Sequence, residues 1–336
     1  MKRKLIPAVL FAALTALAST QVLAQAQDIR VGNATANDTQ AAANDKLAEL
    51  ITKYSKGKLK ATASHGESLG NNQQMIRALQ AGSLHGMVFP AGFLSPVVPE
   101  LAMFDMPFAL PSAPAAITAF TAQSKAATVM IALAEQKGVH ILGFHGIGPQ
   151  SFLTNFPVTK LADVQGKKFR VIPSAPRVGA YKDWGAVARP MELGEVYTAL
   201  QQRTLDGMEN PPDVIFKMKL HEAARYYTVT EHFAFVSNII VSKKWYDGLT
   251  PELKEAVTKA GEDTIKFADA AYTKSQNESL DAMRKVITVT NMPAAEIQKM
   301  KELTSKGVWE AMKQDPQRGP VVRMLADDVT RFNSKK

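Results

Sequence analysis

Two polar side chains, Arg170 and Asn210, are the residues of this 336-residue sequence best suited to bind a small anion. Arg170 stands in the apolar run 169–172, and Asn210 directly precedes two prolines. A guanidinium stays charged when it is buried, so it needs an anionic partner, and its planar fork matches a carboxylate. The prolines have no N–H donors that compete with the Asn210 amide. Both residues therefore predict a site for an oxygen-rich anion.

Each residue also has a structural explanation that the sequence leaves open. Arg170 would reach solvent if its face of the strand were exposed. Asn210 would serve as an Asx turn that ends the strand before it. The choice depends on the elements that position the two side chains.

A repeated segment indicates how those elements are arranged. Residues 78–87 and 199–208 are identical at six of ten positions, and each predicts a helix that leads into a strand. We expect two similar lobes with a polar site between them. The repeat predicts that Arg170 lies on a strand equivalent to 59–63 of the first half. Open α/β sheets bind ligands at strand carboxyl ends, where Arg170 and Asn210 should converge.

Hydrophobic periodicity predicts alternating strands and helices and hence an α/β fold with a mostly parallel sheet. Strands are expected at 28–33, 59–63, 84–89, 139–144, 168–172, 205–208 and 233–242, and helices at 40–54, 73–81, 115–137, 175–184, 192–202 and 251–284. The last helix is long enough to cross between lobes, which favours discontinuous domains. The Pro-rich and aromatic stretch 90–114 predicts a connection packed on the first lobe, with a cleft rim as the alternative.

The N-terminus predicts a secretory signal peptide over residues 1–24. Three basic residues precede a short apolar run and a small-residue exit, and that run is too short to span a bilayer. The net charge is +9, or +6 without the basic residues of this segment. This mild excess suits an anionic small molecule and gives little support to a nucleic-acid surface. Without cysteine, disulfides and thiol chemistry are excluded, and a bacterial periplasm is the expected compartment.

Catalytic and metal-binding patterns are weak. The six histidines lack metal-ligand spacing, and no phosphate loop or dinucleotide fingerprint occurs, so we expect no metal and no cofactor. The main enzymatic alternative is an exported serine hydrolase that uses Ser68, because 66–70 reads Gly-Glu-Ser-Leu-Gly, a nucleophile-elbow pattern. A glycine-rich oxyanion motif is missing, which weakens that alternative.

The sequence resembles the periplasmic substrate-binding subunits of tripartite ATP-independent periplasmic (TRAP) transporters of the dicarboxylate-binding type. The matching segments are 163–171, 191–211, 69–70, 81–83 and 104–108. The resemblance implies two α/β lobes with a ligand cleft between them, a shared hinge strand and a long connecting helix. It assigns 27–147 and 236–276 to lobe I, and 148–235 and 277–330 to lobe II.

The same resemblance implies roles for individual residues. Arg170 would bind the ligand carboxylate and Asn210 would donate a hydrogen bond to it. Many relatives carry a further arginine where this chain has Gln150, so one positive charge is missing, and a monocarboxylate with an apolar or aromatic body is favoured over a dicarboxylate. Other candidates near strand ends or the hinge are Glu67, Asn72, Phe89, Trp184 and Phe235.

We therefore expect a non-enzymatic periplasmic receptor for an organic acid. The resemblance implies a small and a large membrane subunit as partners and transport driven by an ion gradient. A monomer is expected. A receptor for an ATP-driven importer or a sensor kinase is the remaining alternative to a TRAP receptor.

Overall fold

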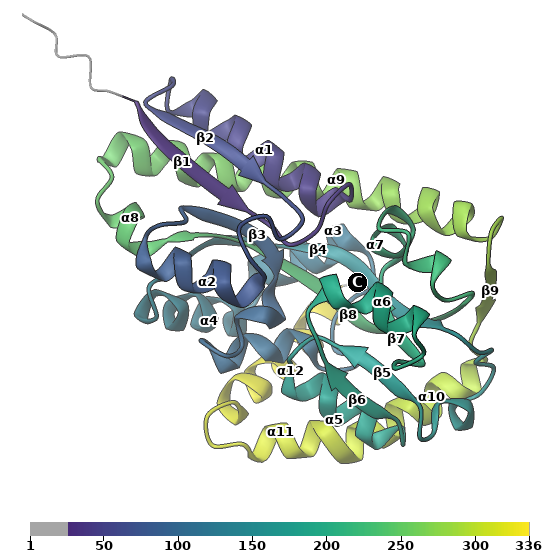
Figure 1. The fold of residues 1–336 in the computed structure, drawn as a ribbon. Coiled ribbons are helices and arrows are strands. Elements are labelled where there is room, and N and C mark those ends of the chain that lie inside the picture. The colour runs from purple at the N-terminus through teal and green to yellow at the C-terminus, as the bar shows by residue number, and fades with distance from the viewer. Residues whose placement is uncertain (1–25, 336) are drawn as a thin grey trace, which may run out of the picture.

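The computed structural model describes residues 26–335, and the predicted signal peptide lies outside them. Its centre is one nine-stranded sheet in the order β2-β1-β3-β8-β4-β7-β5-β6, with β9 paired to β8 (Figure 1). The strands are β1 (Gln27–Gly32), β2 (Leu59–Ser64), β3 (Gly86–Pro90), β4 (Val139–Thr154), β5 (Lys168–Val171), β6 (Val187–Pro190), β7 (Gly207–Asn210), β8 (Tyr226–Ser242) and β9 (Thr288–Asn291).

Two parallel groups of strands define two lobes. We call the part built on β2-β1-β3 lobe I and the part built on β7-β5-β6 lobe II. The long strands β4 and β8 pair antiparallel with each other and run through both lobes. The predicted strands at 139–144 and 233–242 were too short. Three irregularities in the β4–β8 register accommodate the glycines and proline of β4, which read in sequence as strand breakers.

Helices cover both faces of the sheet (Figure 1). They are α1 (Thr39–Tyr54), α2 (Asn72–Ala81), α3 (Pro114–Gln123), α4 (Lys125–Gln136), α5 (Ala175–Asp183), α6 (Val196–Gln201), α7 (Pro212–Lys217), α8 (Lys243–Asp247), α9 (Pro251–Met283), α10 (Ala294–Thr304), α11 (Glu310–Gln314) and α12 (Gly319–Asn333). The stretch after β3 forms the short 3₁₀ helices η1 (Ala91–Leu94) and η2 (Pro99–Asp105), and a further 3₁₀ turn, η4 (Leu193–Glu195), precedes α6.

The single helix predicted at 115–137 was wrong. The chain breaks at Ser124, which is extended and caps α4 by accepting from the Ala127 N–H. Asp328 of α12 fixes this break, because its carboxylate accepts from the Ser124 hydroxyl and the Ala126 N–H. A distant contact therefore overrides local periodicity. In residues 26–335 no single helix is long and apolar enough to cross a membrane; α3 and α4 pass that test only as a pair, bent by 75°.

The predicted equivalence of the Arg170 strand was also wrong. β5 lies between β7 and β6, as β1 lies between β3 and β2, so β5 corresponds to β1 and not to 59–63. The counterpart of β2 is β6, a four-residue edge strand that the sequence did not indicate. Its exposed residues give no buried period-2 pattern to detect. Arg170 is therefore on the central strand of lobe II.

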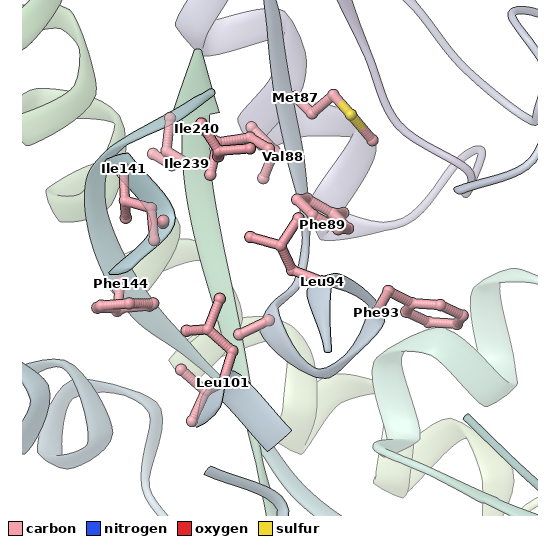
Figure 2. Packing of buried hydrophobic residues seen from close by; sticks show 14 of the residues in the cluster. Met87, Val88, Phe89, Phe93, Leu94, Leu101, Ile141, Phe144, Ile239 and Ile240 are labelled. Carbon is pink, nitrogen blue, oxygen red and sulfur yellow. The ribbon is translucent and has the colours of Figure 1, made fainter. Parts of the chain in front are cut away.

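Buried side chains form one hydrophobic cluster in lobe I and two in lobe II. Figure 2 shows the lobe I cluster, where Val88 of β3 packs beside Ile239 and Ile240 of β8. The strands are fully buried here because helices cover both faces of the sheet (Figure 1). Such packing fixes β3 and β8 at the point where they lead into the space between the lobes.

The C-terminal helices connect the lobes. Helix α9 contacts α1 of lobe I, α7 of lobe II and the strand β4 that runs through both lobes. The lobe boundaries given by the family resemblance stay a prediction. They assign 277–330 to lobe II. However, α12 packs on α4 and α3, and Val321, Val322 and Leu325 belong to the lobe I cluster.

Candidate functional site

A small cavity with a volume of about 20 Å³ lies between the lobes. Most of its walls come from the carboxyl ends of β1, β3, β5 and β7 and from the segments that follow them. Asn72 after β2, Leu193 after β6 and Phe235 of β8 complete the walls. The lining residues are Ala34, Thr35, Gln40, Asn72, Pro90, Phe93, Arg170, Ile172, Leu193, Asn210, Val214 and Phe235. This location agrees with the sequence prediction that the site lies at strand carboxyl ends.

Arg170 is a buried cation without an acidic partner. It is 3% exposed, and its Nε donates to the carbonyl oxygen of Met191 (2.9 Å). Among residues 26–335 no carboxylate forms an ion pair with it, and its buried Nη2 has no partner. Burial lowers the pKa of Arg170 to about 10, so it remains charged at neutral pH. An unpaired buried charge is costly, and a ligand carboxylate would remove that cost.

Asn210 presents a second unsatisfied donor at the end of β7. It is 1% exposed, its Nδ2 is buried without a partner, and its carbonyl oxygen accepts from the Tyr227 hydroxyl (3.3 Å). Strand β7 pairs with β5 so that Met208 lies opposite Arg170. The pairing brings both unsatisfied donors to one cavity.

The rest of the cavity is largely apolar, with one unsatisfied acceptor. Asn72, the first residue of α2, donates from Nδ2 to Glu192 (3.0 Å), while its Oδ1 is buried without a partner. Phe235 contributes a wall from β8. Eight lining residues were not predicted. Six of them are apolar and resemble ordinary core in the sequence; the eight are Ala34, Thr35, Gln40, Pro90, Phe93, Ile172, Leu193 and Val214.

Four of the eight predicted ligand-binding residues line the cavity, namely Arg170, Asn210, Asn72 and Phe235. Of the others, Phe89 is buried in the lobe I cluster, and Trp184 lies in a lobe II cluster, where its indole donates to Met300 (3.2 Å). Periodicity does not separate such core aromatics from residues that line a cleft.

Gln150 and Glu67 also lie outside the cavity lining. Gln150 is buried on β4, and its side-chain oxygen accepts from Arg177 of α5. Glu67 has a positive φ of 62° in the loop after β2 and reaches η4 of lobe II, where the Gly194 N–H donates to it. Burial and the nearby charge of Glu192 raise the pKa of Glu67.

A buried ionic cluster centred on Arg177 was not predicted. Arg177 is 0% exposed and pairs with Glu209 of β7 (2.7 Å) and with Asp105 of η2 in lobe I (2.7 Å). The Tyr181 hydroxyl donates to the same Glu209 carboxylate. Although burial lowers the pKa of Arg177, Asp105 and Glu209 raise it above the usual value. Arg177 lies in the first turn of α5, and nothing in the neighbouring sequence predicts that its side chain is buried.

A second polar contact joins the lobes beside the cavity. Asp213 of α7 accepts from the N–H and the hydroxyl of Thr39 (3.2 Å each), which begins α1. Lys217 pairs with Asp213 (2.8 Å). Asp38, the N-cap of α1, lies nearby; burial, with a contribution from Asp213, raises the pKa of Asp38 to about 6. Two carboxylates therefore meet at this contact.

The serine-hydrolase alternative has no catalytic geometry. Ser68 is exposed, and within residues 26–335 no histidine is hydrogen-bonded to it. The nearest histidine in sequence, His65, contacts Asn33 (2.6 Å) and Asp45 (2.9 Å). A nucleophilic serine requires a base within hydrogen-bond reach. The described part of the chain also contains no group of three or more acidic or histidine side chains that could hold a metal.

Comparison with known proteins agrees with this geometry. The family model described as bacterial extracellular solute-binding protein, family 7, matches residues 31–315. The 2,3-diketo-L-gulonate-binding periplasmic protein YiaO of Escherichia coli is 30% identical over 287 residues, which cover 84% of this chain and 86% of that protein.

Solved structures have the same fold. The sugar acid binding protein DctPAm of Advenella mimigardefordensis, in complex with galactonate, superposes with a TM-score of 0.85 at 26% identity and covers 91% of this chain and 99% of its own. A TRAP periplasmic solute-binding protein of Sulfitobacter sp. NAS-14.1 with bound β-D-galacturonate superposes with a TM-score of 0.83 at 26% identity. The match covers 90% of this chain and 100% of that protein's chain.

Proposed function

We propose, from the premise that this chain belongs to family 7 of the bacterial extracellular solute-binding proteins, that its cavity binds an organic acid through the carboxylate of that acid. The protein is a periplasmic solute receptor of the TRAP type, in a family of binding proteins and not of enzymes. The function of the cavity is therefore capture, and its chemistry consists of hydrogen bonds, charge and closure around a solute.

The observation that carries the proposal is the unpaired guanidinium of Arg170. Its free Nη2 and the free Nδ2 of Asn210 are buried donors at the same cavity. Each buried donor without a partner costs about 1–3 kcal/mol, and more when it is charged. A carboxylate that accepts from both donors removes these costs and gains a charge-assisted hydrogen bond.

The lining favours a monocarboxylate. Arg170 is the one charged side chain among the residues that line the cavity, so a second ligand carboxylate would lack a basic partner there. Phe93 and Phe235 favour an apolar body in the ligand. The free Oδ1 of Asn72 can accept a hydrogen bond from a ligand hydroxyl. We infer a hydroxylated monocarboxylate, and relatives that bind galactonate and galacturonate support this class.

Delivery completes the function. In our proposal the two lobes open to admit the acid and close around it, with β4, β8 and α9 as the connections that bend. The closed receptor, acting as a monomer, then docks on the small and the large membrane subunits of its TRAP transporter, which an ion gradient drives. The alternative partners, an ATP-driven importer or a sensor kinase, are not supported by the family match.

A thermal-shift screen of organic acids against the mature protein tests the proposal. An acid at about one hundred times its dissociation constant should stabilise the protein by roughly 2.7 kcal/mol. The screen should pair each monocarboxylate with its neutral amide and with the matching dicarboxylate. Binding of the amide as tightly as the acid would overturn the carboxylate assignment. Tighter binding of the dicarboxylate would overturn the monocarboxylate assignment alone.

A further inference from the structure

Lobe II contains two buried guanidiniums in opposite electrostatic situations. Arg170 has no acidic partner, whereas Arg177 pairs with two carboxylates, those of Glu209 and Asp105. All four side chains are buried. Arg177 contacts both carboxylates, and Arg170 forms an ion pair with neither of them. The distribution of these charges decides how attractive the cavity is to an anion.

Glu209 is the acid whose charge matters most to the carboxylate site. It directly precedes Asn210, and among nearby charges it acts most strongly on Arg170. Although burial raises the pKa of Glu209, the contacts of His232, Arg177 and Tyr181 lower it, so Glu209 is ionised. Without Arg177, an uncompensated negative charge would lie one residue from the donor that meets the ligand. It would repel an anionic ligand.

Arg177 also connects the site to lobe I. Its Nη2 donates to Asp105 at the end of η2 (2.7 Å), and its Nη1 donates to Glu209 (2.7 Å). The guanidinium carbon lies 5.4 Å from the ring centroid of Phe235, which lines the cavity. The contact with Asp105 joins a side chain of lobe II to one that follows β3 of lobe I. Charge compensation of Glu209 and contact between the lobes therefore share one side chain.

We propose that Arg177 is a positioning residue of the carboxylate site: it neutralises Glu209 beside Asn210, so that the positive charge of Arg170 remains available to the ligand, and it ties this arrangement to lobe contact through Asp105. This inference rests on the proposed carboxylate site. It adds a residue that does not line the cavity and that the sequence did not single out.

A pair of matched double variants tests the charge role, with acetate as the probe because it is a carboxylate with almost no body. Arg177→Gln should bind acetate about ten- to a hundredfold more weakly than wild type, as expected for an uncompensated charge several ångströms away. Arg177→Gln/Glu209→Gln should recover most of that loss. Arg177→Gln/Asp105→Asn removes the other acid and should bind acetate as weakly as Arg177→Gln. Equal recovery in both doubles, or in neither, would overturn the proposal and indicate a purely structural arginine.

A measurement without ligand keeps this test separate from the carboxylate proposal. In Arg177→Gln the buried Glu209 loses its cation, so its pKa should rise above the unfolded value. The free energy of unfolding of this variant should then fall as the pH rises through that raised pKa. Arg177→Gln/Glu209→Gln should lack the fall. If both variants have the same pH profile, Arg177 does not compensate Glu209; if acetate fails to bind wild type, the carboxylate proposal alone fails.

Discussion

The repeated segments of the two lobes reach the same cavity and contribute different chemistry to it. In lobe I, α2 leads into β3, which buries Phe89 in the core and ends with Pro90 on the cavity. In lobe II, α6 leads into β7, which ends with Glu209 and Asn210. The fold therefore fixes where each strand ends, and the last residues decide what it offers. Lobe II supplies the charge and the amide donor, while lobe I supplies the neutral polar residues Thr35, Gln40 and Asn72, and both lobes supply apolar surface.

This difference predicts an unequal division of binding free energy. Substitutions at the polar residues of lobe II should weaken ligand binding most, and those of lobe I should act through selectivity or through contact between the lobes.

Arg170→Gln should have the largest effect. Loss of a buried charge that meets the ligand carboxylate should weaken binding at least a hundredfold, about 3 kcal/mol or more, by titration calorimetry with the best acid of the screen. The unliganded variant should unfold at a higher temperature than wild type, because an unpaired buried charge has been removed. Arg189→Gln is the matched control, since Arg189 lies opposite on β6 and is exposed. Unchanged affinity in Arg170→Gln would remove the basis for the division between lobes.

Asn210→Ala should have the next largest effect. Loss of one hydrogen bond to a carboxylate costs about 1–2 kcal/mol, or five- to thirtyfold in affinity. Asn210→Asp should lose more than Asn210→Ala, because it sets a carboxylate against that of the ligand. Titration calorimetry measures the ligand affinity of both variants. Tighter binding by Asn210→Asp than by Asn210→Ala would mean that Asn210 does not face the carboxylate.

Asp38→Asn should remove part of the pH dependence of stability. The pKa of Asp38 is raised by burial to about 6, from 3.8, so the protonated form is favoured in the folded state. The contribution of Asp38 to the free energy of unfolding is fully present below pH 3.8 and is lost as the pH rises through about 6. Between pH 5 and pH 7 the free energy of unfolding of wild type, measured with denaturant, should fall by about 1 kcal/mol more than that of the variant. Asp28→Asn, on an exposed position of β1, should keep the wild-type profile.

Asn72→Ala should weaken binding by less than about 1 kcal/mol, because it removes one neutral hydrogen bond contributed by lobe I. The loss should be confined to ligands that carry a hydroxyl and should vanish for their deoxy analogues. A loss greater than that of Asn210→Ala would reverse the proposed roles of the two lobes.

Ser68→Ala should leave both ligand affinity and stability within about 0.5 kcal/mol of wild type, because Ser68 is exposed and has no base. An ester substrate incubated with wild type measures the alternative directly. Hydrolysis that disappears in Ser68→Ala would restore the hydrolase hypothesis.

Much of this architecture was predictable because it depends on local signals. The strand–helix alternation predicted β1, α1, β2, α2 and β3 to within about two residues, and Thr250 and Pro251 located the start of α9. Elements that depend on distant contacts were missed. The helix break at Ser124 depends on a hydrogen bond to Asp328. Strand β6 forms because it pairs with β5 at the edge of the sheet.

The residue types of the site and their approximate place follow from local sequence features. A charged residue in an apolar run and an amide before two prolines are local features, and parallel strands bring their carboxyl ends to one edge. Arg170 and Asn210 are therefore recognisable from the order of residues along the chain. The family resemblance added the two-lobed arrangement and the expected class of ligand.

Which buried side chains lack a hydrogen-bond partner depends on how distant segments pack together. Gln150 and Arg170 are both buried, but Gln150 accepts from Arg177 while Arg170 Nη2 has no partner, and this difference depends on α5 packing against β4 and β7. Asp105, more than seventy residues before Arg177, completes the cluster across the lobe boundary. Hydrogen-bond satisfaction and charge compensation are properties of neighbours in space, so no local pattern of residues encodes them.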